Sequence, residues 1–195
     1  MKLSSTLLLI LLCSISAIGQ TDTKPCDLAF DEIDPFDSLR VVGMKPVSIG
    51  YMIPSRYETM DGPKIVEEAK AIMVYSENDS IRGFFLNLVV PEYNLEPIDK
   101  GMTVKLLLQD STVIGFYNIP DEGYFDRAIN MRVYQHTCAV PLDYYYQLTF
   151  KRITKIRIEY QKKNRILELS ERQQNALLEA FQCVGRAVEL YPVNP

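Results

Sequence analysis

The chain of 195 residues carries 21 basic and 25 acidic residues, a formal net charge of −4, and one histidine. This modestly acidic balance argues against a general nucleic-acid-binding protein, because such proteins neutralise phosphates with clustered cations. A single histidine also excludes metal sites built from several imidazoles. The length allows one domain with a sizeable hydrophobic core.

The first nineteen residues have the pattern of a secretory signal peptide. Lys2 is their only charged residue, an apolar run follows from Leu7 to Leu12, and Ala17 and Gly19 are small residues just before Gln20. A basic start, a short apolar core and a small-residue cleavage site are typical of export signals. The sequence therefore predicts a signal peptide over 1–19, with cleavage before Gln20.

Two other fates of this segment fit its residues less well. Lipid attachment would modify Cys13, but Leu11 and Leu12 stand where small residues usually precede such a cysteine. A retained anchor would need about 20 apolar residues, which this run lacks, and no later stretch is long and apolar enough to span a bilayer. We therefore expect an exported protein, periplasmic or extracellular, that does not span the membrane.

Three cysteines remain after the predicted cleavage: Cys26, Cys138 and Cys183. An odd number in an oxidising compartment indicates one disulfide and one free thiol, and three pairings are possible. Cys138 lies in a strand-like apolar run, which is typical of a buried cysteine that behaves as a small hydrophobe. Cys26 and Cys183 lie near the two chain ends, which often meet in a domain. The favoured prediction is a Cys26–Cys183 disulfide.

The first elements in chain order are an acidic segment and a strand. Residues 20–40 are predicted to be a solvated acidic segment ahead of a single β-rich domain over 41–195. Apolar and polar residues alternate over 47–53, which predicts a half-buried strand. A polar stretch with turn signals then extends over 55–68.

The remaining elements are strands with short connections, followed by one helix. Asp143 is predicted to cap a short helical segment over 143–150. Ser170 and Gln173 form a capping box at the start of an amphipathic helix over 171–188. Further strands are predicted over 69–75, 81–90, 102–108, 112–117, 129–140, 153–160 and 165–169.

Hairpin-length connections favour antiparallel pairing of these strands. We therefore predict a mostly β fold, an antiparallel β-sandwich-like domain with one amphipathic C-terminal helix covering one face or end. Such a domain would use its loops or a hairpin as a contact surface.

Short motifs lie at both ends of the chain. Cys26 is followed by the acidic, Phe-containing stretch Asp31–Asp37 and by Val41–Val42, and the strand Ile153–Ile158 stands just before the terminal helix. These two ends resemble those of small exported proteins of Bacteroides-type Gram-negative bacteria. The resemblance implies a compartment and a sandwich fold, and it implies no activity.

The same resemblance implies a modification. Bacteria of that type O-glycosylate exported proteins at Asp followed by Ser or Thr and then an apolar residue or Thr. Ser38, Ser80 and Ser111 stand in such triplets. They are therefore possible O-glycosylation sites.

Catalytic and metal-binding patterns are absent from the sequence. His136 and Cys138, the one conceivable Cys–His pair, would lie about 6.5 to 7 Å apart along a strand, too far for a direct hydrogen bond. The acidic residues between Asp27 and Asp37 lack the central Gly and terminal Glu of the familiar calcium loop. We predict no catalytic residue, no metal site and no cofactor.

The strongest local signal is a run of basic residues that could bind polyanions: Lys151, Arg152, Lys155, Arg157, Lys162, Lys163 and Arg165. Lys155 and Arg157 share the outward face of their strand. One interpretation is a surface that attracts anionic glycans or lipid phosphates. The other, which we favour from sequence, is protection of a hairpin edge against aggregation, because lysine on an edge strand blocks pairing.

Two classes of function follow from these observations. The first is a non-catalytic binding or assembly module of the cell envelope, whose partner is an envelope protein or a glycan. The second is an envelope hydrolase that uses carboxylates with no recognisable spacing. The lack of a nucleophile motif favours the binding module.

Overall fold

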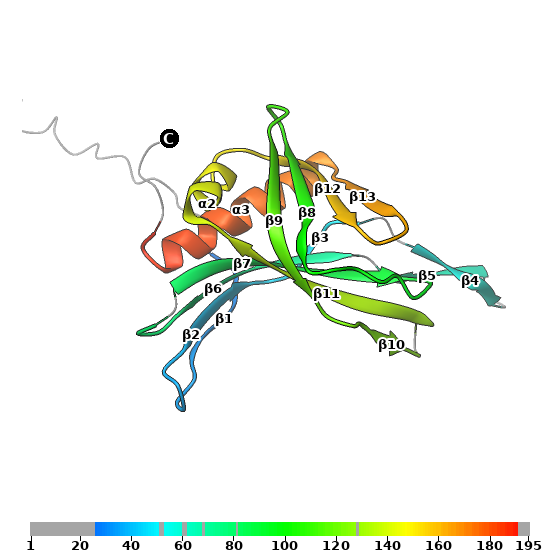
Figure 1. Cartoon of the computed structure of the whole chain (residues 1–195), viewed down its shortest axis with the longest axis horizontal. Coiled ribbons are helices and arrows are strands. Elements are labelled where there is room, and N and C mark those ends of the chain that lie inside the picture. Colours follow the sequence, from blue (N-terminus) through cyan, green and yellow to red (C-terminus); the bar gives the residue numbers. More distant parts are fainter. Residues whose placement is uncertain are drawn as a thin grey trace, which may run out of the picture.

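One open antiparallel sheet of eleven strands forms most of the fold (Figure 1). The structure, a computed structural model, describes residues 26–50, 53–59, 62–67, 69–80, 82–127 and 129–190, so the predicted signal peptide lies outside the described residues. The strands of this sheet are β1 (Leu28–Ile33), β2 (Arg40–Met44), β3 (Val47–Ser48), β6 (Lys70–Glu77), β7 (Arg82–Glu92), β8 (Gly101–Leu108), β9 (Val113–Pro120), β10 (Tyr124–Asp126), β11 (Met131–Val140), β12 (Ile153–Glu159) and β13 (Asn164–Glu168).

The strand order is β1-β2-β6-β7-β11-β9-β8-β12-β13, with β3 beside β6 and β10 beside β11. The mostly β, antiparallel prediction is confirmed, but the two stacked sheets of a sandwich are not found. β11 pairs with β7 along most of its length and with β9 only at His136–Cys138. This short pairing joins what would otherwise be two sheets into one, and the single sheet then curves.

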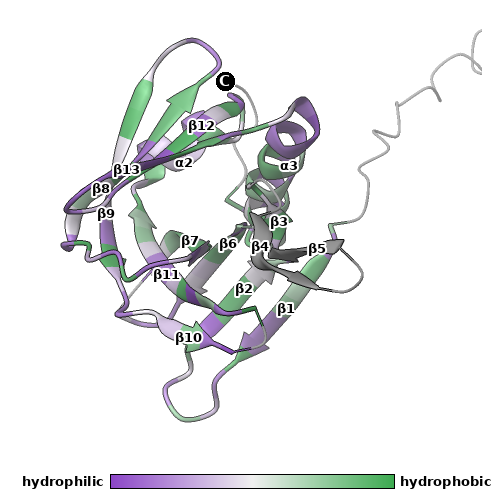
Figure 2. Ribbon diagram, turned by 90° about the vertical axis from the view of Figure 1, so that its right-hand side faces the viewer, coloured by the Kyte–Doolittle hydropathy of each residue, from purple (hydrophilic) through white to green (hydrophobic). Residues whose placement is uncertain are grey.

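The C-terminal helix α3 (Glu171–Ala187) lies on the concave side of the curved sheet (Figure 2). It contacts β2, β3 and β6 on one side and β12 on the other. Its buried residues, among them Leu177, Phe181 and Val184, follow the predicted helical spacing. The predicted capping box is also present, since the side chains and backbone amides of Ser170 and Gln173 bond reciprocally. The helix therefore fills the space that the sheet encloses.

The short helix α2 (Leu142–Leu148) packs against the same core. Tyr145 stacks on Phe84 of β7 with ring centroids 3.6 Å apart, and its hydroxyl donates to the Phe181 carbonyl of α3 at 2.9 Å. The predicted Asp143 cap is wrong, because Asp143 lies in the first turn and the N-cap residue is Pro141. Neither helix of the described ranges is long and apolar enough to cross a membrane.

The structure differs from the sequence prediction at two polar segments. Part of the acidic segment 20–40 forms β1, which pairs with β2 as the first strand of the sheet. The polar stretch after residue 53 forms a two-stranded ribbon, β4 (Ile53–Thr59) and β5 (Gly62–Glu67). Neither strand of this ribbon has a long run of apolar residues, so hydrophobic periodicity did not reveal them.

The predicted disulfide is confirmed. Cys26, just before β1, is bonded to Cys183 on α3, with Cα atoms 5.3 Å apart. Cys138 on β11 is free and buried, as predicted. The bond ties the first strand of the sheet to the helix in its concave side, across 157 residues of chain.

We expect the Cys26→Ser/Cys183→Ser variant to remain folded but to lose about 2–4 kcal/mol of unfolding free energy. The reason is that a long closed loop restricts the unfolded chain, whereas the core is large enough to fold without it. Urea denaturation of the variant and of a Cys138→Ala control measures the difference. Non-reducing peptide mapping that finds Cys138 in a disulfide would contradict this assignment.

Candidate functional site

The inner face of the sheet becomes polar at the end where β7 finishes. Five buried or half-buried residues meet there, which we call the inner polar cluster: Glu92, Asn118, His136, Tyr160 and Arg165. They come from β7, β9, β11 and β13 and from the residue that follows β12. The curvature of the sheet brings these five positions together. Their side chains point inward by the strand alternation that places apolar neighbours in the core.

Glu92 carries the strongest interaction of this cluster. Its residue is 1% exposed, and its carboxylate accepts two hydrogen bonds from Arg165, from Nε at 2.9 Å and Nη2 at 2.8 Å. Lys163 donates to the same carboxylate at 3.2 Å and pairs with Glu96 at 2.9 Å. Burial of Arg165 lowers its pKa. The hydrogen bond to Glu92 and the negative charge of Glu92 raise the pKa by more, so the net change is an increase. The bidentate pair joins β7 to β13, the last strand of the sheet.

His136 is fully buried between two polar partners. Asn118 Nδ2 lies 3.3 Å from His136 Nδ1, and the Tyr160 hydroxyl lies 3.4 Å from Nε2. Each ring nitrogen of His136 therefore faces one polar side chain, and Asn118 also contacts the Thr103 hydroxyl at 3.1 Å. Burial lowers the pKa of His136 to about 4, although the carboxylates of Asp121 and Glu92 oppose the shift. The imidazole is therefore neutral at pH 7.

The inner polar cluster contains residue types that an acid–base site uses, but these residues are not free to act on a substrate. Glu92 is neutralised by two cations, and Glu96 shares Lys163 with it. Burial raises the pKa of the Cys138 thiol to about 12, so the thiolate that a nucleophile requires is scarce. Within the described ranges, no three His, Cys, Asp or Glu side chains converge to hold a metal ion. The cluster joins strands and offers no free carboxylate to a substrate.

A surface cleft of about 400 Å³ lies beside this cluster, and its lining includes Glu96, Asp121 and Tyr134. Two of its acids, Glu96 and Asp121, are also engaged, Glu96 by its ion pair with Lys163. Asp121 Oδ1 accepts from the backbone amides of Gly123 at 3.0 Å and Gln135 at 2.9 Å. The Tyr134 hydroxyl accepts from the Glu96 amide at 2.8 Å. These bonds hold the loops in place, and they favour a structural role for both acids.

The seven predicted basic residues do not form one patch. Strand alternation sends Lys155 and Arg157 to the outer face of the sheet and Arg165 to the inner face, where it reaches Glu92 together with Lys163. Lys151 pairs with Asp110 at 2.7 Å and Arg152 with Glu171 at 3.7 Å, both away from the others. Lys162 is exposed in the turn and forms no ion pair with the part of the chain that the structure describes. The contiguous run in sequence is therefore divided in space.

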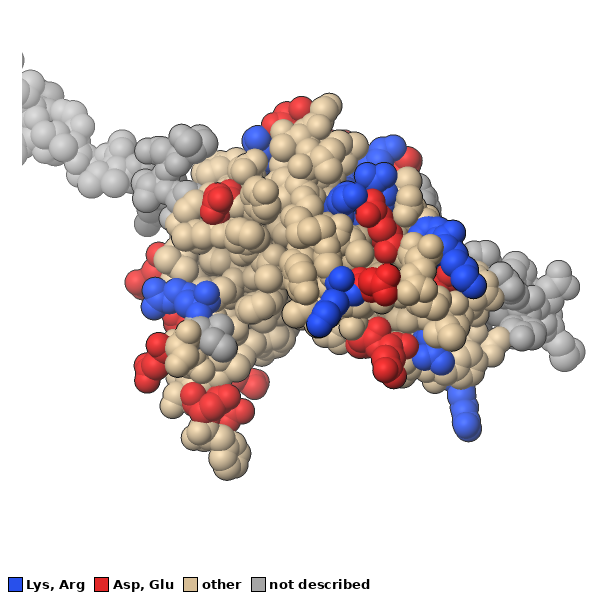
Figure 3. Space-filling view, viewed as in Figure 1, with Lys and Arg blue, Asp and Glu red and all other residues tan. Residues whose placement is uncertain are grey.

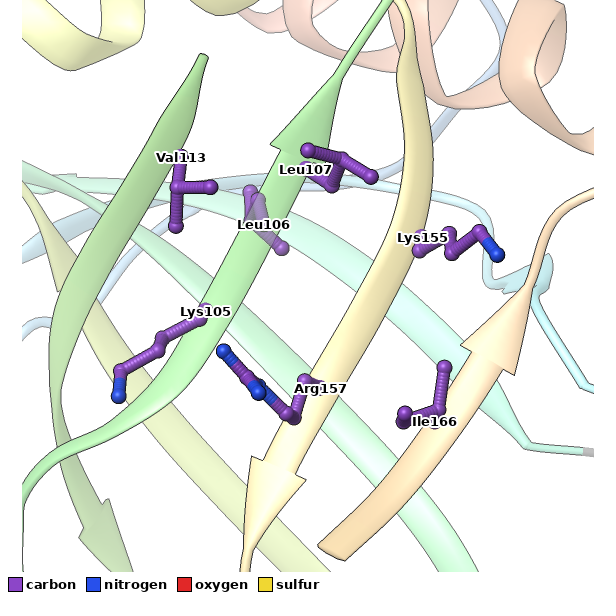
Figure 4. A pocket seen from close by; sticks show the side chains of 7 residues that line it. All are labelled: Lys105, Leu106, Leu107, Val113, Lys155, Arg157 and Ile166. Atoms are coloured by element: carbon purple, nitrogen blue, oxygen red, sulfur yellow. The ribbon is translucent and has the colours of Figure 1, made fainter. Parts of the chain in front are cut away.

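The outer face of β8, β9, β12 and β13 has a groove of about 220 Å³, which we call the outer groove (Figure 4). Its lining joins apolar and cationic side chains: Lys105, Leu106, Leu107, Val113, Lys155, Arg157 and Ile166. Val113 is 57% exposed and Ile166 is 51% exposed. Figure 3 shows Lys and Arg over β12 and β13, with Asp and Glu among them.

Each cation of the outer groove has an acidic neighbour, but the acids are fewer. Lys105 and Arg157 share Glu159, at 2.7 Å and 3.5 Å, and Lys155 pairs with Glu168. The three cations and two carboxylates leave a net positive charge around the apolar floor. The Lys155–Glu168 pair is exposed and the Lys105–Glu159 pair is partly exposed, and ion pairs in contact with solvent contribute little to stability.

Two of the groove's contributions could not be found from the basic run. Lys105 lies about fifty residues before the run in sequence and reaches the groove because β8 pairs with β12. In the sequence, Val113 is an ordinary apolar strand residue, and only the structure shows that β9 exposes it. The favoured edge-protection interpretation is wrong for Lys155 and Arg157, because β12 has a neighbouring strand on each side, β8 and β13.

The three possible O-glycosylation sites lie in exposed connections between strands. Ser38 lies between β1 and β2, Ser80 between β6 and β7, and Ser111 between β8 and β9. Ser38 and Ser111 have positive φ angles of 56° and 68°. Their hydroxyls are accessible, and their modification stays a prediction.

We expect Glu92→Gln to lower the unfolding free energy by about 2–4 kcal/mol, because it leaves the Arg165 guanidinium without its buried counter-charge. Glu168→Gln is the matched control, since it removes the exposed partner of Lys155 and should cost less than about 1 kcal/mol. Urea denaturation at pH 7 measures both. Equal losses in the two variants would show that the Glu92 pair does not hold β7 and β13 together.

The buried imidazole predicts a pH dependence of stability. As the pH falls below about 6.5, the unfolded chain binds a proton at His136 before the folded chain does, since the folded pKa is about 4. The unfolding free energy should therefore fall from pH 6.5 to pH 4, by roughly 3 kcal/mol from this group. A His136→Gln variant should show a shallower slope in this window by urea denaturation. The same slope in both proteins would contradict the prediction.

Comparison with known proteins adds no relative to this description. No protein-family model, no curated protein and no solved structure matches the chain.

Proposed function

We propose that the protein is exported to the cell envelope and acts there as a non-catalytic binding module. Its contact surface is the outer groove. The inner polar cluster stabilises the sheet on whose outer face the groove lies. The N-terminal signal pattern supports export, as does the Cys26–Cys183 disulfide, because such bonds persist in oxidising compartments.

The observation that carries the proposal is the exposed apolar floor of the outer groove with cations around it. Val113 and Ile166 are each more than half exposed on strands whose opposite faces are buried. No helix of the described residues covers this face, since α2 and α3 both pack on the concave side. An exposed apolar surface with a polar rim is characteristic of an interaction site.

The chemistry of the groove selects its partner class. The apolar floor suits an aliphatic or aromatic group, and Lys105, Lys155 and Arg157 suit carboxylates or sulfates beside it. An envelope protein with acidic and apolar residues side by side meets both requirements. An anionic glycan would satisfy the cations but would leave the apolar floor without a matching group.

The inner polar cluster supports binding over hydrolysis. A carboxylate-based hydrolase needs one acid and one base that face a substrate cleft. Glu92 and Glu96 converge, but both are ion-paired with Lys163 and Glu92 also with Arg165. The acids that geometry brings together are therefore already used.

We expect a photo-crosslinking residue placed at Ile166 to capture a partner in the producing cell. The same residue placed at Phe125 on β10 is the matched control, because both native side chains are 51% exposed. A Lys155→Glu/Arg157→Glu background should abolish the Ile166 adduct and leave any Phe125 adduct unchanged. Mass spectrometry identifies the adducts. Equal yields of the same adducts at both positions would overturn the proposed role of the outer groove.

A further inference from the structure

The hairpin formed by β1 and β2 ends in an exposed aromatic residue. Phe36 is 97% exposed, and Ile33 at the end of β1 is 65% exposed. We call residues 32–38 the hairpin tip. Figure 1 shows this hairpin extending away from the body of the sheet. A large apolar side chain held in solvent at the end of a projecting hairpin contributes nothing to the core of its own chain.

The hairpin tip is held in one conformation by local hydrogen bonds. Asp34 Oδ1 accepts from the Phe36 amide at 2.8 Å, and Asp37 Oδ1 accepts from the Leu39 amide at 2.9 Å. The Asp34 amide donates to the Leu39 carbonyl at 2.9 Å across the turn. Arg40 and Asp31 form a bidentate pair at its base. A group ordered before binding loses less conformational entropy when it binds.

The hairpin tip also carries negative charge that the described part of the chain does not pair. Glu32, Asp34 and Asp37 are exposed and have no cation within 4 Å among the described residues, whereas Asp31 is taken by Arg40. In Figure 3, acidic residues gather over β1 and β2 at the lower left, and cations with acids among them lie over β12 and β13 at the upper right. One molecule therefore displays an acidic aromatic projection and a cationic apolar groove in separate places.

The hairpin tip and the outer groove are complementary, because one projects and the other is hollow and their net charges are opposite. The outer groove offers an apolar floor for an aromatic ring and Lys105, Lys155 and Arg157 for carboxylates. The hairpin tip offers Phe36 with carboxylates on both sides. β1 and β13 are the first and last strands of the sheet order, and the tip projects away from the body, so the tip of one chain does not occupy its own groove.

We infer that the outer groove receives the hairpin tip of a second copy of this chain, so that copies associate head to tail. The inference rests on the proposed binding role of the groove and names its occupant. The two contacting surfaces differ, so the interface is heterologous and each dimer keeps one free tip and one free groove. Association therefore continues into open chains or closes into rings. A small contact of this kind is weak, and by mass action a larger fraction of the copies associates where they are concentrated.

Sedimentation velocity of the purified protein over rising concentration tests the inference. The unmodified protein should form dimers and larger species, and added salt should weaken them because the charges at the groove are exposed and screened. Phe36→Ala should weaken association at least about tenfold, as expected when an aromatic anchor is truncated. Phe125→Ala is the control, which removes a half-exposed aromatic ring outside the hairpin tip and should leave association unchanged.

The groove is tested with a charge reversal. Lys155→Glu/Arg157→Glu should abolish association, whereas Lys100→Glu/Lys162→Glu, with the same charge change at exposed positions outside the groove, should weaken it much less. Circular dichroism and urea denaturation confirm that each variant is folded.

Mixing the two defective variants gives the sharpest result. Phe36→Ala retains an intact groove, and the groove variant retains an intact tip. A mixture should therefore form a dimer containing one of each, and no larger species, because the remaining tip and groove are both defective. Larger species in the mixture, or no dimer, would overturn the head-to-tail arrangement.

The outcomes also separate this inference from the proposed function. A crosslink from Ile166 to a different envelope component, without association of the purified protein, would leave the binding role standing and reject the second copy as occupant. Association that Phe36→Ala does not change would reject the hairpin tip, for example if edge strands paired instead. The inference is supported if both the tip variant and the groove variant lose association and Ile166 crosslinks to a second copy of the chain.

Discussion

The ion pair of buried Glu92 and half-buried Arg165 joins two distant parts of the curved sheet. An antiparallel sheet that bends this far must bring its last strand, β13, to the end of its central strand, β7. The bidentate contact is made there, at 2.8 and 2.9 Å, between residues 73 positions apart. Desolvation of a carboxylate is costly unless its charge is matched, so Glu92 favours the arrangement in which β13 closes on β7.

A second closure lies on the other side of the sheet. α3 fills the concave side and contacts β2, β6 and β12 together, and the Cys26–Cys183 bond ties it to the start of β1. The inner space is therefore apolar around the helices and polar around Glu92 and His136. Because successive strand residues face opposite sides, the same strands that build this interior present Lys155, Arg157 and Ile166 on the outer face.

This division connects stability with function. Buried carboxylates that could suggest catalysis are used to close the sheet, and the outer groove is the contact surface that we propose. The hairpin tip is supported in the same way, since the Asp31–Arg40 pair and the turn hydrogen bonds hold Phe36 in solvent. A rigid body with a projecting anchor and a separate receptor surface is suited to assembly.

The sequence by itself predicted the antiparallel β class and the C-terminal helix with its Ser170–Gln173 capping box, because periodicity and capping are local signals. It favoured Cys26–Cys183 among three possible pairings, because both cysteines lie near the chain ends. It also placed His136 and Cys138 on one strand and made a dyad between them unfavourable. Only the tertiary structure decided that one curved sheet replaces a sandwich, since the three-residue pairing of β9 with β11 has no sequence signature. The tertiary structure also divided the basic run and brought Lys105 to the outer groove. The physical reason is that strand pairing over long distances, together with the two-residue alternation, decides which charges share a face, and neither can be read from adjacency in the chain.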